Sequence, residues 1–178
     1  IRTAREARAP LSLIEQVQRI NDERKIAMVP RIEAALGGSL DGKSISVLGV
    51  TFKPNTDDMR EAPSLTIVPM LQERGAAVRV YDPQGRLHGE QMLPGVTWAK
   101  DSIDAATNVD AVVILTEWNE FRALDLARLR QVMRGDVMVD LRNIFKGEDA
   151  EAAGFRYDSI GRPNTAAAGQ TAAVEAAE

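Results

Sequence analysis

The chain has 178 residues, of which 44% are hydrophobic, and its formal net charge is −4. Its apolar content suffices for the core of one ordinary domain, and its acidic balance does not suggest a surface for nucleic acid. No apolar run is long enough to span a membrane, and the absence of cysteine excludes disulfides, thiolate metal sites and a cysteine nucleophile within these residues.

The first predicted element is a long helix over residues 11–36. Apolar residues recur along it at helical spacing: Leu13, Val17, Ile20, Met28, Ile32 and Leu36. Pro30 lies well inside and lacks a backbone N–H, so we expect either a kinked helix or two helices. The helix is longer than a small domain needs to cover its sheet. It is therefore either an amphipathic helix packed on its own domain or a connector or dimer element.

Predicted strands and helices alternate from residue 44 onwards. The predicted strands are 45–52, 77–83, 111–116 and 137–141, with edge strands near 96–98 and 155–160; the predicted helices are 65–73, 102–107 and 124–133, and 84–101 is otherwise an irregular connection. Ser102 is the expected cap of its helix. This order predicts an α/β fold, a Rossmann-like parallel sheet with helices on both faces. The Gly-rich fingerprint is absent after the first strand, so this domain is not expected to hold NAD in the usual way.

A polar loop with two cations, Lys53 and Arg60, follows the first predicted strand. A strand that leads through a loop into a helix places that loop at the carboxyl edge of the sheet, where open α/β sheets bind ligands. Cations at this edge suit phosphate or carboxylate groups. The residues alone equally allow a solvated turn whose charges pair with each other. The single histidine, His88, has no partner for a metal site, so we predict no metal and assign it no role.

Three segments carry a resemblance to a known family. Residues 49–64, GVTFKPNTDDMREAPS, closely resemble the signature of the UDP-glucose/GDP-mannose dehydrogenase family, most of all its UDP-glucose 6-dehydrogenase branch. Residues 116–121 and 139–145 resemble two further family segments, although Leu141 stands where the family more often has glycine. Residues 11–21 resemble the start of the long central helix that joins the two domains in this family and builds its dimer.

The resemblance implies a cytoplasmic, NAD-dependent enzyme that oxidises UDP-glucose to UDP-glucuronate in two successive steps. The chain would form its C-terminal part, with a connecting and dimerisation helix in residues 1–38, a nucleotide-sugar-binding α/β domain in 39–162, and a disordered tail in 163–178. We expect a homodimer through the central helix. The family's covalent route needs a cysteine, so we predict no catalytic residue in this chain and no activity from it alone. The alternatives are a stand-alone, non-catalytic nucleotide-sugar-binding module, or a related UDP-N-acetylhexosamine or GDP-mannose dehydrogenase.

The resemblance also implies roles for individual residues. Phe52 and Lys53 match residues that contact the nucleotide-sugar, and Arg142 matches a region that does so. Arg60 matches the residue that reaches NAD bound on the other domain. A planar guanidinium binds the oxygens of a diphosphate in pairs, which agrees with these roles in kind.

Other residues near these segments are expected to be structural. Asp57 and Asp58 would orient Lys53, Arg60 or backbone amides rather than touch an anionic ligand. Arg142 equally suits a structural ion pair with Asp140 or a neighbour. Two aromatic residues, Trp118 and Phe121, are expected to pack in the core or between domains.

Overall fold

The computed structural model describes residues 11–162, and its centre is a six-stranded sheet in the order β3-β2-β1-β4-β5-β6. All neighbouring strands are parallel. The strands are β1 (Ser44–Leu48), β2 (Ala77–Tyr81), β3 (Thr97–Trp98), β4 (Ala111–Ile114), β5 (Val137–Asp140) and β6 (Arg156–Ser159). The predicted parallel α/β fold is confirmed.

Helices cover both faces of this sheet. On one face α2 (Ser12–Ala35) and α3 (Ser64–Glu73) pack on inward residues such as Val47 and Val113. On the other face α5 (Ser102–Ala106), α6 (Asn119–Arg122), α7 (Leu126–Val132) and α8 (Gly147–Ala152) pack on residues such as Leu48 and Met138. Central strands β4 and β5 are buried on both sides, which is why they are continuous apolar runs rather than alternating ones.

The strands end level with one another at the carboxyl edge. Leu48, the last residue of β1, pairs with Tyr81 on one side and Ile114 on the other. Ile114 in turn pairs with Asp140, the last residue of β5. The loops that follow these strands therefore meet at one edge, as expected for an open parallel sheet.

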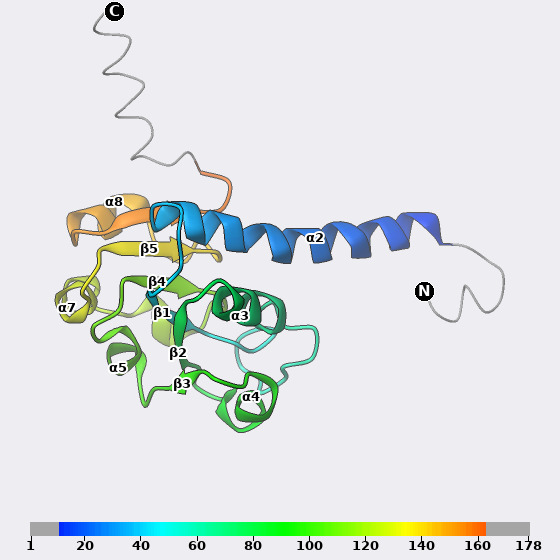
Figure 1. Cartoon of the computed structure of the whole chain (residues 1–178), viewed down its shortest axis with the longest axis horizontal. Helices are drawn as coiled ribbons and strands as arrows, with labels where there is room; N and C mark the ends of the chain where they lie inside the picture. Colours follow the sequence, from blue (N-terminus) through cyan, green and yellow to red (C-terminus); the bar gives the residue numbers. More distant parts are fainter. Residues whose placement is uncertain (1–10, 163–178) are drawn as a thin grey trace, which may run out of the picture.

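The long helix α2 is continuous through Pro30, so the alternative of two separate helices is wrong. Pro30 is exposed, where water can bond to the carbonyl that the ring leaves without a partner. The C-terminal part packs on the domain: Val29 and Ile32 are fully buried, and the Arg31 guanidinium donates to Asp158 and to the carbonyl of Ser159. The N-terminal half extends away from the sheet (Figure 1). The expectation of a helix packed on its own domain is therefore met by the C-terminal half, and the connector or dimer role of the N-terminal half stays a prediction.

Three helices were not expected from the sequence: α4 (Arg86–Met92), α6 and α8. Helix α4 occupies 7 residues of the predicted irregular connection 84–101, although it contains Gly89, a poor helix former. The ring of Trp98 packs so closely on Gly89 that a Cβ there would lie 2.4 Å from it. Tertiary packing therefore overrides local propensity in this segment.

Two local expectations need correction. The first strand ends at Leu48 rather than residue 52, because Gly49 turns the chain with a φ of 83°. The cap of α5 is Asp101 rather than Ser102, since the Asp101 carboxylate accepts a hydrogen bond from the Asp104 amide at 2.7 Å. The predicted disordered tail, 163–178, lies outside the described residues. Within residues 11–162 no helix is both long and apolar enough to cross a bilayer.

Candidate functional site

A buried carboxylate, Asp82, lies at the carboxyl edge of the sheet. It follows β2 directly and is only 4% exposed. Its two oxygens accept six hydrogen bonds: Oδ2 from the amides of Val50 (2.7 Å) and Thr51 (3.1 Å), the Thr51 hydroxyl (3.1 Å) and the Trp118 indole (3.2 Å), and Oδ1 from the amides of Gln84 (3.0 Å) and Gly85 (2.7 Å). Asp82 thus joins the loops after β1, β2 and β4. The sequence predicts a strand over residues 77–83, and that pattern alone gives Asp82 no role.

The backbone that follows β1 is fixed by further bonds. The Thr116 hydroxyl donates to the Thr51 carbonyl at 2.8 Å, and the Ser64 hydroxyl donates to the Val50 carbonyl at 2.5 Å. The amide of Phe52 donates to the carbonyl of Asp58 at 2.9 Å. The backbone of residues 50–52 is therefore held by hydrogen bonds through both its amides and its carbonyls. This fixes the backbone from which the side chains of Phe52 and Lys53 extend.

The amides of this turn have no capacity left for a pyrophosphate. The Gly49 amide donates to the Tyr81 carbonyl at 2.8 Å, and the next amides donate to Asp82 and Asp58 as above. A dinucleotide site of the usual Rossmann kind needs free amides at this position. The turn after β1 thus does not fit NAD bound in that way, which agrees with the missing glycine fingerprint.

We call the loops that follow the strands at the carboxyl edge of the sheet the rim. A cavity of about 540 Å³ lies beside the rim, between these loops and α2. Phe52, which is 50% exposed, lies in its wall together with Arg142, Leu141 and Pro63, and α2 contributes Asn21, Lys25 and Met28. The cavity therefore brings together two of the three residues assigned to the nucleotide-sugar. Lys53 is exposed outside this lining, and within residues 11–162 its ammonium forms no hydrogen bond or ion pair.

Arg142, in the loop after β5, forms an ion pair with Glu117, in the loop after β4. Its Nε donates to Glu117 at 2.5 Å, and its amide donates to Asp140 at 3.0 Å. The guanidinium lowers the pKa of Glu117 below its ordinary value, mainly through that hydrogen bond. The expected structural pair of Arg142 is present, with Glu117 as its side-chain partner. Arg142 keeps this ion pair and also lines the cavity, and its contact with a nucleotide-sugar stays a prediction.

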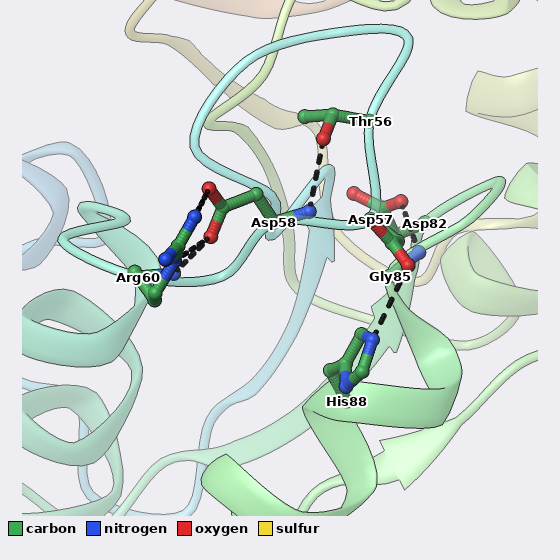
Figure 2. A network of polar contacts seen from close by, with 7 residues as sticks. All are labelled: Thr56, Asp57, Asp58, Arg60, Asp82, Gly85 and His88. Atoms are coloured by element: carbon green, nitrogen blue, oxygen red, sulfur yellow. Dashed lines mark hydrogen bonds and ion pairs between the residues drawn. The ribbon is translucent and has the colours of Figure 1, made fainter.

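Arg60 lies at a second concavity, apart from Phe52 and Arg142. This pocket of about 410 Å³ is lined by Arg60 together with Thr56, Asp57, His88 and Met92 among others. Two guanidinium nitrogens of Arg60 donate to Asp58, Nε at 2.9 Å and Nη2 at 2.8 Å (Figure 2). The guanidinium holds the pKa of Asp58 well below its usual range. Asp58 therefore orients Arg60, as expected.

Asp57 behaves differently from Asp58. Its carboxylate lies 3.2 Å from Nε2 of His88, a residue of helix α4 (Figure 2). Within residues 11–162 neither Lys53, Arg60 nor a backbone amide is its partner, so the expected orienting role of Asp57 is corrected. His88 lies on a helix rather than in the loop that the sequence indicated. Among residues 11–162 no group of three or more His, Cys, Asp or Glu residues is placed to hold a metal.

The remaining aromatic residues of these segments are structural. Trp118 is 5% exposed and Phe121 is fully buried, and both lie in the core cluster under α6 and α7. The expectation that they pack rather than stack on a nucleobase is confirmed. The Trp118 indole also donates to Asp82, which the sequence did not reveal.

Comparisons with known proteins agree with this fold. Residues 46–147 match the model of the UDP-glucose/GDP-mannose dehydrogenase family, UDP binding domain. The chain is 48% identical, over 164 residues and 92% of its length, to a UDP-glucose 6-dehydrogenase of Rhizobium meliloti. Among solved structures it resembles a UDP-glucose dehydrogenase of Pyrobaculum islandicum (32% identity, TM-score 0.72, 89% of this chain) and an NDP-N-acetyl-D-galactosaminuronic acid dehydrogenase of Methanosarcina mazei (27%, 0.77, 90%). The chain spans only 38%, 34% and 35% of these three proteins, respectively.

Proposed function

The chain belongs to the UDP-glucose/GDP-mannose dehydrogenase family, and we propose that it is the nucleotide-sugar-binding part of an NAD-dependent UDP-glucose 6-dehydrogenase. The observation that carries this proposal is the cavity of about 540 Å³, whose wall combines Phe52 and Arg142 of the matched UDP-binding region with residues of α2. It is placed where open α/β sheets bind their ligands.

The exposed cations of the rim suit a UDP-sugar. Arg142 borders the cavity with a planar guanidinium, and a diphosphate offers the paired oxygens that such a group binds. Lys53 follows Phe52 directly and forms no hydrogen bond or ion pair within residues 11–162, so its charge is available to the ligand. Phe52 contributes its ring and its fixed backbone to the same wall.

Arg60 is proposed to face NAD held by another domain. It lies at the second pocket, away from the proposed sugar cavity, and its side chain is 85% exposed. Asp58 fixes the direction of the guanidinium through two hydrogen bonds. NAD supplies the hydride acceptor for alcohol oxidation. The residues of this chain bind and orient substrate and cofactor, and none of them is proposed to react.

The division into a helix (1–38), a sugar-binding domain (39–162) and a tail (163–178) remains part of the proposal. We propose that the N-terminal half of α2 forms a homodimer. Its apolar side chains Leu13, Ile14, Val17 and Ile20 are 50% to 78% exposed in the single chain. A row of this kind is typical of a surface that another chain covers.

The 178 residues contain no cysteine, so we expect that this chain alone does not oxidise UDP-glucose. Reduction of NAD by the purified chain, above a mock preparation, would contradict this. The Methanosarcina mazei relative, whose name gives an N-acetylated sugar, keeps a related UDP-N-acetylhexosamine dehydrogenase as the alternative. A stand-alone sugar-binding module is the second alternative.

Thermal unfolding with UDP, UDP-glucose, GDP-mannose and NAD tests the proposal. A ligand at about 100 times its dissociation constant should raise the free energy of unfolding by roughly 2.7 kcal/mol. We expect UDP and UDP-glucose to raise Tm, GDP-mannose not to, and Lys53→Ala to weaken the effect. Lys43→Ala, which precedes β1 at the opposite edge, is the matched control. Absence of any shift in the wild-type chain would contradict a sugar-nucleotide site on this domain.

A further inference from the structure

We propose that Asp82 is the positioning residue for the nucleotide-sugar site, acting through Thr51 on Phe52 and Lys53. Ligand affinity would then depend on a buried carboxylate that does not touch the ligand. This inference rests on the proposed function. It extends that function from the exposed cations Lys53, Arg60 and Arg142 to a buried residue.

The first argument is the reach of the Asp82 contacts. The carboxylate bonds residues 31 to 36 positions away, Thr51 and Val50 in one direction and Trp118 in the other. It also bonds its own loop at Gly85, where a Cβ would lie 2.8 Å from Thr51 Cγ2. The loops after β1, β2 and β4 are thus packed around one side chain.

The second argument is chemical. All six donors to Asp82 are neutral N–H or O–H groups, so the carboxylate is held by hydrogen bonds and not by a cation. An asparagine of the same shape has one acceptor oxygen, and its NH₂ group would face donors. Asp82→Asn therefore removes four or two of the six bonds, according to which oxygen the NH₂ group replaces, and leaves donors unsatisfied with little change in side-chain volume.

The third argument is the path to the ligand. Thr51 bonds Asp82 through both its amide and its hydroxyl, and Phe52 and Lys53 are the next two residues. The Phe52 amide continues the chain of contacts to Asp58, which holds Arg60. Site residues bind best when their support is rigid before the ligand arrives, because less order is then lost on binding. Loss of the Asp82 bonds should loosen residues 50–53 and weaken binding through Lys53.

The test uses the full 178-residue chain and four variants: Asp82→Asn, Lys53→Ala, their double mutant, and Leu129→Ala. Leu129 of helix α7 is fully buried in the core on the far side of the sheet from α2, so Leu129→Ala controls for general destabilisation. Backbone amide exchange is measured at residues 50–53, and the dissociation constant for UDP is measured by calorimetry. We expect Asp82→Asn to speed exchange at these amides and to weaken UDP binding on the order of tenfold.

Coupling separates positioning from general destabilisation. If Asp82 acts through Lys53, Asp82→Asn should weaken UDP binding on the order of threefold or less once Lys53 is already alanine. Leu129→Ala should lower Tm but leave exchange at residues 50–53 and UDP affinity near wild type. Thr51→Val serves if Asp82→Asn does not fold, since it removes one of the six bonds and keeps the methyl group against Gly85. It should shift exchange and affinity in the same direction by a smaller factor.

Two results would overturn the inference: unchanged exchange at residues 50–53 in the folded Asp82→Asn chain, or additive losses in the double mutant. A wild-type chain that does not bind UDP would instead contradict the proposed function, and the ligand half of this inference with it. The exchange measurement needs no ligand, so the two failures are distinguishable.

Discussion

Two buried aspartates support the rim, and they do so over different distances. Asp82 ends the β2 strand region and bonds groups from three loops, up to 36 positions away. Asp140 ends β5, is fully buried, and bonds the amides of Arg142 and Phe145, two and five residues later. Its other partner is the Tyr157 hydroxyl at 2.8 Å.

The two aspartates therefore support the loops in different ways. The local bonds of Asp140 shape the loop that carries Arg142, so that loop is largely determined by its own sequence. The long-range bonds of Asp82 instead fix the loops relative to one another. Loss of Asp82 should therefore disturb the whole edge, whereas loss of Asp140 should disturb one loop.

The largest effect is expected from truncating the two carboxylates. Asp82→Ala leaves six donors without an acceptor and should lower the free energy of unfolding by about 4 kcal/mol, against about 2–3 kcal/mol for Asp140→Ala. Denaturant unfolding followed by circular dichroism measures both. Asp57→Ala, at an exposed site, is the control and should change stability by about 0.5 kcal/mol or less. Equal losses for Asp82→Ala and Asp140→Ala would remove the distinction between them.

Alkaline pH should destabilise the fold through the chain's two tyrosines, of which Tyr157 bonds Asp140 and Tyr81 bonds Glu120. Burial, aided by Glu120, raises the pKa of Tyr81 to about 12, and burial with Asp140 raises the pKa of Tyr157 well above its ordinary value. Between pH about 10 and these values the unfolded chain loses tyrosine protons that the folded chain keeps. The two tyrosines therefore contribute their full stabilisation below pH about 10. This contribution is lost as pH rises through the pKa values of the tyrosines in the folded chain.

Unfolding free energy measured across this pH range tests the alkaline loss. Tyr157→Phe should remove the larger part of the pH dependence, because its hydroxyl is the one bonded to the buried Asp140. Tyr81→Phe should remove a smaller part, since the partner of Tyr81, Glu120, is exposed. Stability that stayed flat up to pH about 12 would contradict the raised tyrosine pKa values.

The smallest effect is expected at the ion pair between Glu117 and Arg142. Glu117→Gln should lower the free energy of unfolding by no more than about 1 kcal/mol, because the pair with Arg142 is partly exposed. The lowered pKa of Glu117 means that the pair stabilises the fold above the ordinary carboxyl pKa and that this is lost as pH falls. The variant and the wild-type chain should therefore converge in acid. A constant difference down to low pH would assign the loss to packing instead.

The sequence predicted the parallel sheet because alternation of apolar strands and amphipathic helices is a local pattern. It also indicated the rim, since Lys53 and Arg60 follow a strand end directly. It did not reveal the partners of Arg60 and Arg142 uniquely, nor the separation of these residues into different pockets. Both depend on which loops the strand order brings together. Helix α4 was missed for the same reason, because it depends on Trp98 packing against Gly89.

The sequence by itself determined the fold class, the long N-terminal helix and the ordered loop that identifies the family. These features depend on hydrophobic spacing and on contiguous residues, which can be read directly from the sequence. Only the tertiary structure decided that α2 packs with one half and exposes the other, and that Asp82 unites three loops. The reason is physical: hydrogen bonds between residues tens of positions apart form only when the sheet has already set their distance.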